Sequence, residues 1–302
     1  MTALIALSSG YQFDYMIPSG GLAYDGLGWR WERPLVRVGI IDPSLFTVVI
    51  KTLSYRPIIG NQRWYNPFRA VRPLFDNQLL LNGVANAVSL SNPGYLRWRE
   101  EVAPNVDFSW QRLVASVSPE GSTCEEFAEM VSDLGQLGFV AVEINTSCPN
   151  VAPQRADEVI RCVGIAREAT KKPLILKVSA AQDVSRIIPA VEGKIDAVSI
   201  NAVPWDLVFP ERRSPLAHLG GGAVSGKLAQ QRNWNLLRWI KTISDLPVIG
   251  PDVWDFSDIA RLGELGADAW SFGALQLCFP WKPTMYVKKA QSITRGNSLR
   301  LL

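Results

Sequence analysis

The sequence predicts an α/β protein whose core is a (β/α)8 TIM barrel, with one long excursion inserted after the second strand. Short β-branched apolar runs alternate with longer amphipathic segments, which favours parallel βα units. Eight such units fit a closed barrel better than an open sheet. Apolar residues make up 47% of the 302-residue chain and charged residues 20%, so a large core can form. We therefore expect residues 1–302 to fold as a single domain.

Eight short runs are the predicted strands of this barrel. They are short, apolar and β-branched, as strands covered on both faces are. The weakest of them is the first, Met16–Ser19, which contains few β-branched residues. The others are Phe46–Lys51, Arg112–Ser116, Val140–Asn145, Pro173–Val178, Ala197–Asn201, Pro247–Gly250 and Ala269–Gly273.

Five amphipathic segments between these strands are predicted helices, because their apolar residues recur at the i, i+3, i+4 and i+7 spacing. Gly138 and Gly266 directly follow two of them and are expected to end these helices in a left-handed conformation. The predicted helices are Cys124–Leu137, Asp157–Thr170, Val184–Val191, Asn233–Ser244 and Asp255–Leu265.

A long excursion, residues 52–111, separates the second strand from the third and is rich in Pro, Asn, Trp and Arg. So long a connection in a compact domain usually has a function. The alternative is a surface insertion without a role.

Composition argues against several classes of function. The formal net charge is only +3 without a long basic run, so nucleic acid is not an expected partner. Because no apolar stretch reaches the roughly 18 residues of a membrane span, we expect no such span. The first ten residues lack the basic start of a secretory signal. The four cysteines contain no C-x-x-C pair and are interpreted as free thiols in a cytoplasmic protein. With His218 as the only histidine, neither a His-rich metal site nor a Ser-His-Asp triad is expected.

Polar residues recur where the predicted strands end. Lys51, Ser116, Asn145, Lys177 and Asn201 stand at or near the ends of five consecutive strands. In a (β/α)8 barrel all these ends open onto the face that carries the active site. A lysine in such a place can also be a surface residue with a buried stem. Two lysines and two asparagines at matched ends favour a site.

The segment EINTSCPN, from Glu143 to Asn150, resembles the signature N-x-S-C-P-N of the dihydroorotate dehydrogenase family. Further similar segments follow the family's order, among them TVVIKT from Thr47 to Thr52 and NAVSLSNPG from Asn86 to Gly94. The resemblance extends from about residue 16 to residue 290. It implies an FMN-dependent oxidoreductase that converts dihydroorotate to orotate in pyrimidine biosynthesis.

The resemblance also implies a mechanism in which a base removes the C5 proton of the substrate while its C6 hydride passes to flavin N5. Cys148 corresponds to the cysteine base of the family's soluble class. A thiol suits this role near neutral pH, because its unperturbed pKa is about 8.5. For Cys124, Cys162 and Cys278 we expect inert packing roles instead.

Other site residues follow from the same resemblance. Lys51 is expected to act in catalysis by neutralising the substrate carboxylate or the pyrimidine edge of the flavin, and Lys177 to face the flavin N1–O2 region. Asparagine amides both donate and accept, which suits a cyclic imide. The expected substrate contacts are Asn86, Val88, Ser89, Leu90, Asn145, Asn150 and Asn201. The expected flavin contacts are Ser19, Gly20, Lys51, Ser116, Asn145, Lys177, Gly226, Gly250 and Gly273. Trp29, Trp31, Trp64 and Trp205 fall in loops that could face the flavin, although packing is the expected role of most tryptophans.

The last two βα loops depart from the family pattern, which reads G-x-G-G-I and G-T-A and holds the FMN phosphate with backbone amides. Pro251 lacks an N–H, and Asp252 brings a negative charge close to the phosphate. We expect Asp252 to point away from the phosphate or to cap the next helix, near Phe256. We expect Lys227 or a neighbouring arginine to supply a compensating cation.

Two alternatives therefore remain beside dihydroorotate oxidation. Ser89 replaces a glycine and Ala202 a hydroxyl residue of the family pattern, which favours another cyclic dihydropyrimidine-like substrate. The changed phosphate loop favours a barrel that has lost FMN and acts as a binding subunit. The family implies a homo-oligomer. Because the chain lacks the cysteines of an iron–sulfur cluster, any such electron relay would lie on a separate electron-transfer subunit.

Overall fold

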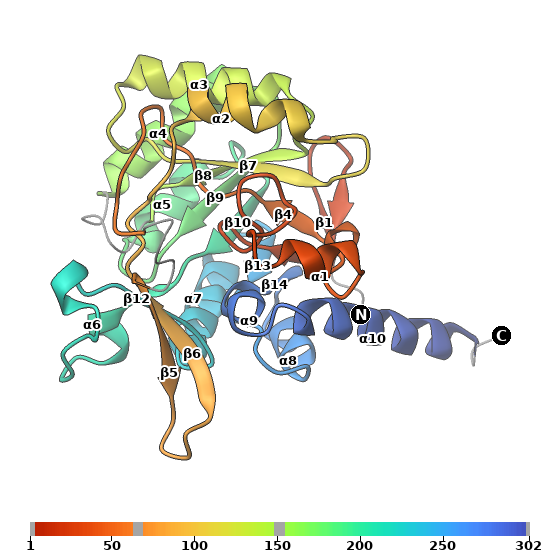
Figure 1. Cartoon of the computed structure of the whole chain (residues 1–302). Coiled ribbons are helices and arrows are strands. Elements are labelled where there is room, and N and C mark those ends of the chain that lie inside the picture. Colours follow the sequence, from red (N-terminus) through yellow and green to blue (C-terminus); the bar gives the residue numbers. More distant parts are fainter. Residues whose placement is uncertain (1–3, 63–68, 148–154, 300–302) are drawn as a thin grey trace.

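A closed barrel of eight parallel strands forms the centre of the computed structural model, which describes residues 4–62, 69–147 and 155–299 (Figure 1). Every neighbouring pair in the barrel is parallel. The strands are β3 (Tyr15–Ile17), β4 (Thr47–Val49), β7 (Leu113–Val117), β8 (Ala141–Asn145), β9 (Leu174–Val178), β10 (Ala197–Ile200), β13 (Val248–Gly250) and β14 (Ala269–Ser271). All eight predicted strands, including the weak first one, are confirmed, and so is the (β/α)8 fold class.

The amino-terminal end of the barrel is closed by an apolar layer. Side chains alternate between the two faces of a strand, so every second residue points into the barrel. One buried residue from each strand joins a single cluster, namely Met16, Val49, Val114, Ala141, Ile175, Ala197, Ile249 and Ala269. Ile5 and Phe13 complete it from the antiparallel hairpin of β1 (Ile5–Ala6) and β2 (Gln12–Phe13). The carboxyl end of the barrel is thereby left for a site.

The outward side chains of the strands pack against a ring of helices, in one continuous core. The first helix of this ring begins at a capping box, in which Thr123 and Glu126 each accept the other's backbone N–H. All five predicted helices match within three residues; the largest differences are at α7, which begins three residues early, and α8, which begins three residues late. The ring consists of α3 (Cys124–Gln136), α4 (Ala156–Ala169), α5 (Val184–Val191), α7 (Gln230–Ile243) and α8 (Asp258–Glu264).

The two glycines that follow helices serve different purposes. Gly266 has the expected left-handed backbone, with φ at +94°. The expectation for Gly138 is wrong, since it is not among the residues with positive φ and the preceding Leu137 is extended. A Cβ built on Gly138 would lie 2.5 Å from Phe108. Close packing, not backbone handedness, therefore requires glycine at this position.

The excursion after β4 folds back over the carboxyl end of the barrel. It contains the hairpin of β5 (Val71–Phe75) and β6 (Leu81–Asn86), which projects from the body of the molecule (Figure 1). β6 also pairs with β12 (Ala223–Gly226), and β12 with β11 (Val203–Pro204), in a separate antiparallel sheet. Asn92 is buried and holds the base of the excursion, because its carboxamide bonds to Ser54 and to the amide of Gly94.

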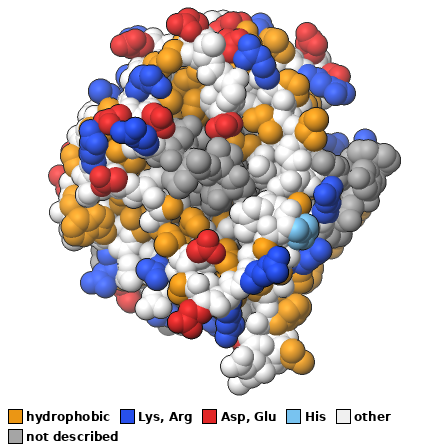
Figure 2. Space-filling model, turned by 90° about the vertical axis from the view of Figure 1, so that its left-hand side faces the viewer, with side chains coloured by type: hydrophobic (Ala, Val, Ile, Leu, Met, Phe, Trp, Pro, Cys, Tyr) orange, Lys and Arg blue, Asp and Glu red, His pale blue; other side chains and the backbone are white. Residues whose placement is uncertain are grey.

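Four short helices complete the described fold, namely α1 (Arg33–Arg37), α2 (Tyr95–Glu101), α6 (Trp205–Val208) and α9 (Gly273–Cys278). The 18-residue helix α10 (Lys282–Leu299) follows α9. Three 3-10 turns lie at Pro43–Leu45, Ala103–Asn105 and Ala217–Leu219. In the parts of the chain that the structure describes, no helix has the length and apolarity needed to cross a membrane. Figure 2 shows acidic and basic side chains interspersed over one face of the molecule.

Candidate active site

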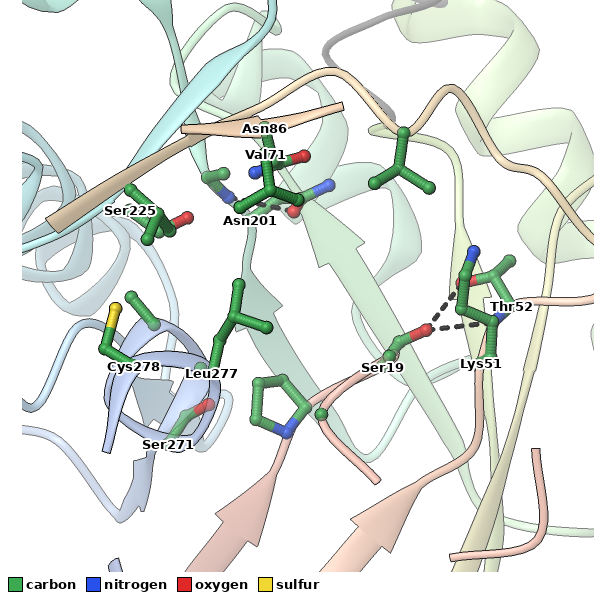
Figure 3. Close-up of a pocket in the computed structure, with 18 of the residues that line it drawn as sticks. Ser19, Lys51, Thr52, Val71, Asn86, Asn201, Ser225, Ser271, Leu277 and Cys278 are labelled. Carbon is green, nitrogen blue, oxygen red and sulfur yellow. Dashed lines mark hydrogen bonds between the residues drawn. The ribbon is translucent and has the colours of Figure 1, made fainter. Parts of the chain in front are cut away.

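A cavity of about 540 Å³ opens at the carboxyl end of the barrel, under the excursion. Its wall combines barrel loops with residues of β5 and β6, so the excursion builds part of the site, as its length predicted. Figure 3 shows Ser19, Lys51 and Thr52 on one side of the cavity and Ser225, Leu277 and Cys278 on the opposite side. We call these two sides the lysine end and the Asp252 end, since Lys51 lines the first and Asp252 follows β13 beside the second.

Most of the site residues that the sequence predicts line this one cavity. They are Ser19, Gly20, Lys51, Asn86, Val88, Ser89, Leu90, Asn145, Lys177, Asn201 and Gly273. Trp29 and Trp31 line it as well, with their rings stacked 5.6 Å apart, whereas Trp205 does not. Cys148, Asn150 and Trp64 lie outside the described residues. Ser116, Gly226 and Gly250 do not line the cavity.

Ser116 lies beneath the cavity floor because the barrel interior is layered. Two residues beyond the apolar layer, the inward positions become polar and include Ser116, Glu143, Lys177 and Ser199. Glu143 is fully buried and accepts hydrogen bonds from Ser116 Oγ at 2.9 Å and Ser199 Oγ at 3.0 Å. Its Oε1 lies 3.3 Å from Lys177 Nζ. The buried carboxylate thus fixes the amine of Lys177, which lines the cavity.

Thr52 connects this layer to the lysine end. Its hydroxyl lies 2.9 Å from Ser116 Oγ and 2.8 Å from Ser19 Oγ. It also accepts a hydrogen bond of 3.0 Å from the side-chain amide of Asn145. Asn145 and Lys177 are direct partners across β8 and β9. The side chains of Ser19, Asn145 and Lys177 therefore belong to one network that holds them in place before any ligand binds.

Two asparagines fix the segment that leads to Cys148. Asn201 donates from its amide to the carbonyl of Ser147 at 2.9 Å and to its hydroxyl at 3.1 Å. Asn145 Oδ1 accepts from the same hydroxyl at 3.3 Å. Both asparagines also line the cavity, so they orient the chain before Cys148 as well as the wall of the site.

The loop that contributes Ser89 and Leu90 has a strained backbone. Their φ angles are +57° and +55°, the left-handed region that side chains other than glycine rarely adopt. Both residues line the cavity beside Asn86 and Val88. A serine therefore stands at a position whose conformation favours glycine.

Asp252 does not cap α8, so that part of the sequence expectation is wrong. It lines the cavity, is 9% exposed, and accepts hydrogen bonds from the Gly226 amide at 2.8 Å and from Asn233 Nδ2 at 2.7 Å. Burial raises the pKa of the Asp252 carboxyl to about 6, against the lowering effect of these two bonds. Asp258, the first residue of α8, instead accepts the amides of Trp254 and Asp255 in the loop before the helix.

The expectations for Lys227 and Gly250 also need correction. Lys227 Nζ lies 3.1 Å from Asp255 in an exposed ion pair, and it is not among the cavity residues. Gly250 faces the helix ring, since a Cβ there would lie 2.9 Å from Ala267 and 3.2 Å from Leu262. Packing outside the barrel, and not contact with a ligand, therefore requires glycine at position 250.

Sequence reasoning assigned no roles to Glu143, Thr52 and Asn233, although they hold the site together. Glu143 had a detectable signal: it is an acidic residue inside an apolar strand, two residues before Asn145 and hence on the same face. Asn233 had none, because it looks like an ordinary polar residue of a helix and its partner Asp252 belongs to another loop.

The described cysteines lie apart from the lysine end. Cys162 is buried in the helix ring, and burial raises the pKa of its thiol to about 11. Cys278 lines the Asp252 end, and burial likewise raises its thiol pKa to about 11. Cys124 is exposed at the start of α3.

The family model and the relatives that match this chain share one name, dihydroorotate dehydrogenase. The family model described as dihydroorotate dehydrogenase matches residues 45–252. A dihydroorotate dehydrogenase B (NAD(+)), catalytic subunit, of Maridesulfovibrio salexigens is 30% identical over 263 residues, which cover 82% of this chain and 79% of that protein. The corresponding subunit of Bacteroides thetaiotaomicron is 29% identical over 215 residues, 66% of this chain and 69% of that one. Dihydroorotate dehydrogenase A (fumarate) of Lactobacillus delbrueckii subsp. bulgaricus is 28% identical over 218 residues, 68% and 67% respectively.

Proposed function

Because the chain belongs to the dihydroorotate dehydrogenase family, we propose that it catalyses the flavin-dependent oxidation of dihydroorotate to orotate in pyrimidine biosynthesis. The observation that carries this proposal is the lysine end of the cavity. There the side chains of Lys51, Lys177 and Asn145 line the same cavity. Two buried amines and an amide suit an anionic cyclic imide beside an electron-accepting ring.

The side chains of the lysine end fit the ring of a flavin, and FMN is the form that the sequence resemblance implies. Ser19, Gly20, Asn145 and Lys177 would hold the ring there. Lys177 is 5% exposed and fixed by Glu143, so its positive charge stands beside the ring without rearrangement. A bound flavin supplies the acceptor, at its N5 atom, for the hydride that leaves C6 of the substrate.

Cys148 is the proposed base, taking the C5 proton of dihydroorotate onto its thiolate as the C5–C6 double bond forms. What supports this role is the anchoring of the preceding residue, Ser147, by Asn145 and Asn201 at the cavity wall. A base held at the end of a fixed segment keeps its distance from the substrate carbon, which is a condition for proton transfer.

Substrate recognition is proposed for the amides and for Lys51. Asn86, Asn145 and Asn201 line the cavity, and Asn150 is the fourth asparagine that the resemblance assigns. Lys51 is 8% exposed at the lysine end, where its charge would neutralise the carboxylate of dihydroorotate or the flavin. Val88, Ser89 and Leu90 would close the substrate side of the cavity.

A second candidate function keeps the flavin and changes the substrate to another cyclic dihydropyrimidine. The strained Ser89 favours it, because its hydroxyl narrows a place that a glycine would leave open. We further propose a homo-oligomer in the cytoplasm, with a separate subunit passing electrons onward. The name of the Bacteroides relative, a catalytic subunit of an NAD(+)-dependent enzyme, supports that arrangement.

The proposal is tested by the flavin absorbance of the purified protein under anaerobic conditions. Dihydroorotate should bleach the flavin absorbance band as soon as it is mixed with the protein. Dihydrouracil should leave the band unchanged. Bleaching by dihydrouracil alone would favour the second candidate. A flavin that neither compound reduces would contradict both functions.

A further inference from the structure

The Asp252 end of the cavity limits which ligands the cavity can accept. In (β/α)8 barrels a phosphate group commonly binds between the loops after the seventh and eighth strands, where backbone amides and a short helix converge. Here those strands are β13 and β14, and α9 follows directly after β14. This is the Asp252 end, so a phosphate on the ribityl chain of a flavin would arrive there.

The amides of the loop after β13 are already occupied. Pro251 has no N–H to offer. The amide of Val253 points to the carbonyl of Ser271 at 3.4 Å. The amides of Trp254 and Asp255 both donate to Asp258, at 3.0 and 2.8 Å. The amides of Val253, Trp254 and Asp255 are thus satisfied within the chain.

Asp252 engages two further donors beside this loop. Its carboxylate accepts the amide of Gly226 on β12 and the carboxamide of Asn233 on α7, while it lines the cavity. Its φ of +60° turns the residue into this position. The chain therefore places its own anion where the barrel fold usually receives a phosphate.

The surroundings of Asp252 offer little to offset a second anion. Leu81, Val84, Leu277 and Cys278 give this end an apolar wall. Lys227, which follows Gly226 in the sequence, is engaged with Asp255 outside the cavity. Arg72 lines the cavity from the exposed edge of β5, where its guanidinium donates to the carbonyl of Val71.

We infer that this cavity accepts an unphosphorylated flavin, riboflavin, in preference to FMN, because Asp252 occupies the anion position of the barrel. The inference rests on the proposed flavin-dependent function and concerns only the form of the cofactor. A ribityl chain that ends in a hydroxyl can donate to the Asp252 carboxylate, whereas a phosphate dianion is repelled by it.

The test is titration of the flavin-free, full-length protein with riboflavin and with FMN at pH 8, followed by quenching of flavin fluorescence. We expect riboflavin to bind at least about tenfold more tightly, because a carboxylate facing a dianion in a half-enclosed cavity costs more than the ~1.4 kcal/mol of a tenfold change. Asp252→Gly and Asp252→Asn should each tighten FMN by about tenfold or more and leave riboflavin within about threefold. Asp255→Asn, which removes an exposed carboxylate outside the cavity, is the matched control and should change neither affinity.

The outcomes separate the inference from the proposed function. If wild-type protein prefers FMN and the Asp252 variants leave that preference intact, the inference is wrong and the function stands. If the FMN preference disappears only in Arg72→Ala, the hairpin holds the phosphate, which also overturns the inference. If wild type and both Asp252 variants bind neither flavin, the proposed function itself fails.

Discussion

Replacing Asp252 by asparagine should make the stability of this protein less dependent on pH. Burial raises the pKa of this carboxyl from 3.8 to about 6 in the folded state. The folded protein therefore holds the proton more tightly than the unfolded chain. The stability that the folded protein gains by holding this proton is fully present below pH 3.8 and is lost as the pH rises through 6. One pKa unit corresponds to about 1.4 kcal/mol. The free energy of unfolding of the wild type is therefore about 3 kcal/mol lower at pH 8 than it would be without this loss.

Asparagine removes the charge and retains most of the hydrogen bonds. Its Oδ1 can still accept the amide of Gly226. Its Nδ2 needs an acceptor, and Asn233 Oδ1 has no hydrogen-bond partner among the described residues. A flip of the Asn233 carboxamide brings this oxygen next to Nδ2 of the new asparagine. The flip breaks the 3.1 Å hydrogen bond from Asn233 to the carbonyl of Asn201. That loss costs about 1 kcal/mol, which leaves a net gain of about 2 kcal/mol at pH 8.

The assay is urea unfolding of the flavin-free protein between pH 4.5 and pH 8, for wild type, Asp252→Asn and the control Asp255→Asn. The gain of Asp252→Asn should be about 2 kcal/mol at pH 8 and should disappear near pH 4.5, where the wild-type carboxyl is protonated. Asp255→Asn should stay within about 0.5 kcal/mol of wild type at every pH, because its carboxylate is half-exposed in solvent. A difference between Asp252→Asn and wild type that does not vary with pH would refute the reasoning.

Four further changes probe the rest of the site. Cys148→Ala should slow reduction of the flavin by dihydroorotate by about 10²–10⁴ in stopped-flow absorbance while flavin stays bound, and near-normal reduction would remove Cys148 from the mechanism. Glu143→Gln should lower the free energy of unfolding by about 3 kcal/mol, because it leaves the Lys177 ammonium buried without its partner. The double variant Glu143→Gln/Lys177→Met should recover part of that loss, and failure to do so would mean that the ion pair is not its source. Ser89→Gly should raise the free energy of unfolding by about 0.5–1 kcal/mol by relieving a positive φ, and a lower urea midpoint would contradict this. Lys51→Ala should weaken both flavin and dihydroorotate in binding titrations, whereas a change in stability alone would assign Lys51 a packing role.

The strands and most helices of this protein were predictable because their signals are local. A run such as Pro247–Gly250 combines β-branching with apolar character, and its neighbours in sequence end it. The position of polar residues at strand ends was enough to predict that Lys51, Asn145 and Asn201 share one cavity, because all parallel strands of a barrel end at one face. Gly266 was predictable for the same reason, since a helix end is a local event.

Contacts between segments far apart in the chain decided the rest. Ser116 and Lys177 both stand near strand ends, but stagger around the barrel places the first beneath the floor and the second in the wall. Gly138 is required by Phe108, thirty residues earlier, and not by the helix that it follows. Asp252 can accept hydrogen bonds from Gly226 and Asn233 only when β12, α7 and the loop after β13 have packed together. The sequence determines the periodicity of each element. A buried carboxylate needs hydrogen-bond donors, because burial without them is too costly, and only the packing of the elements decides which donors lie within reach.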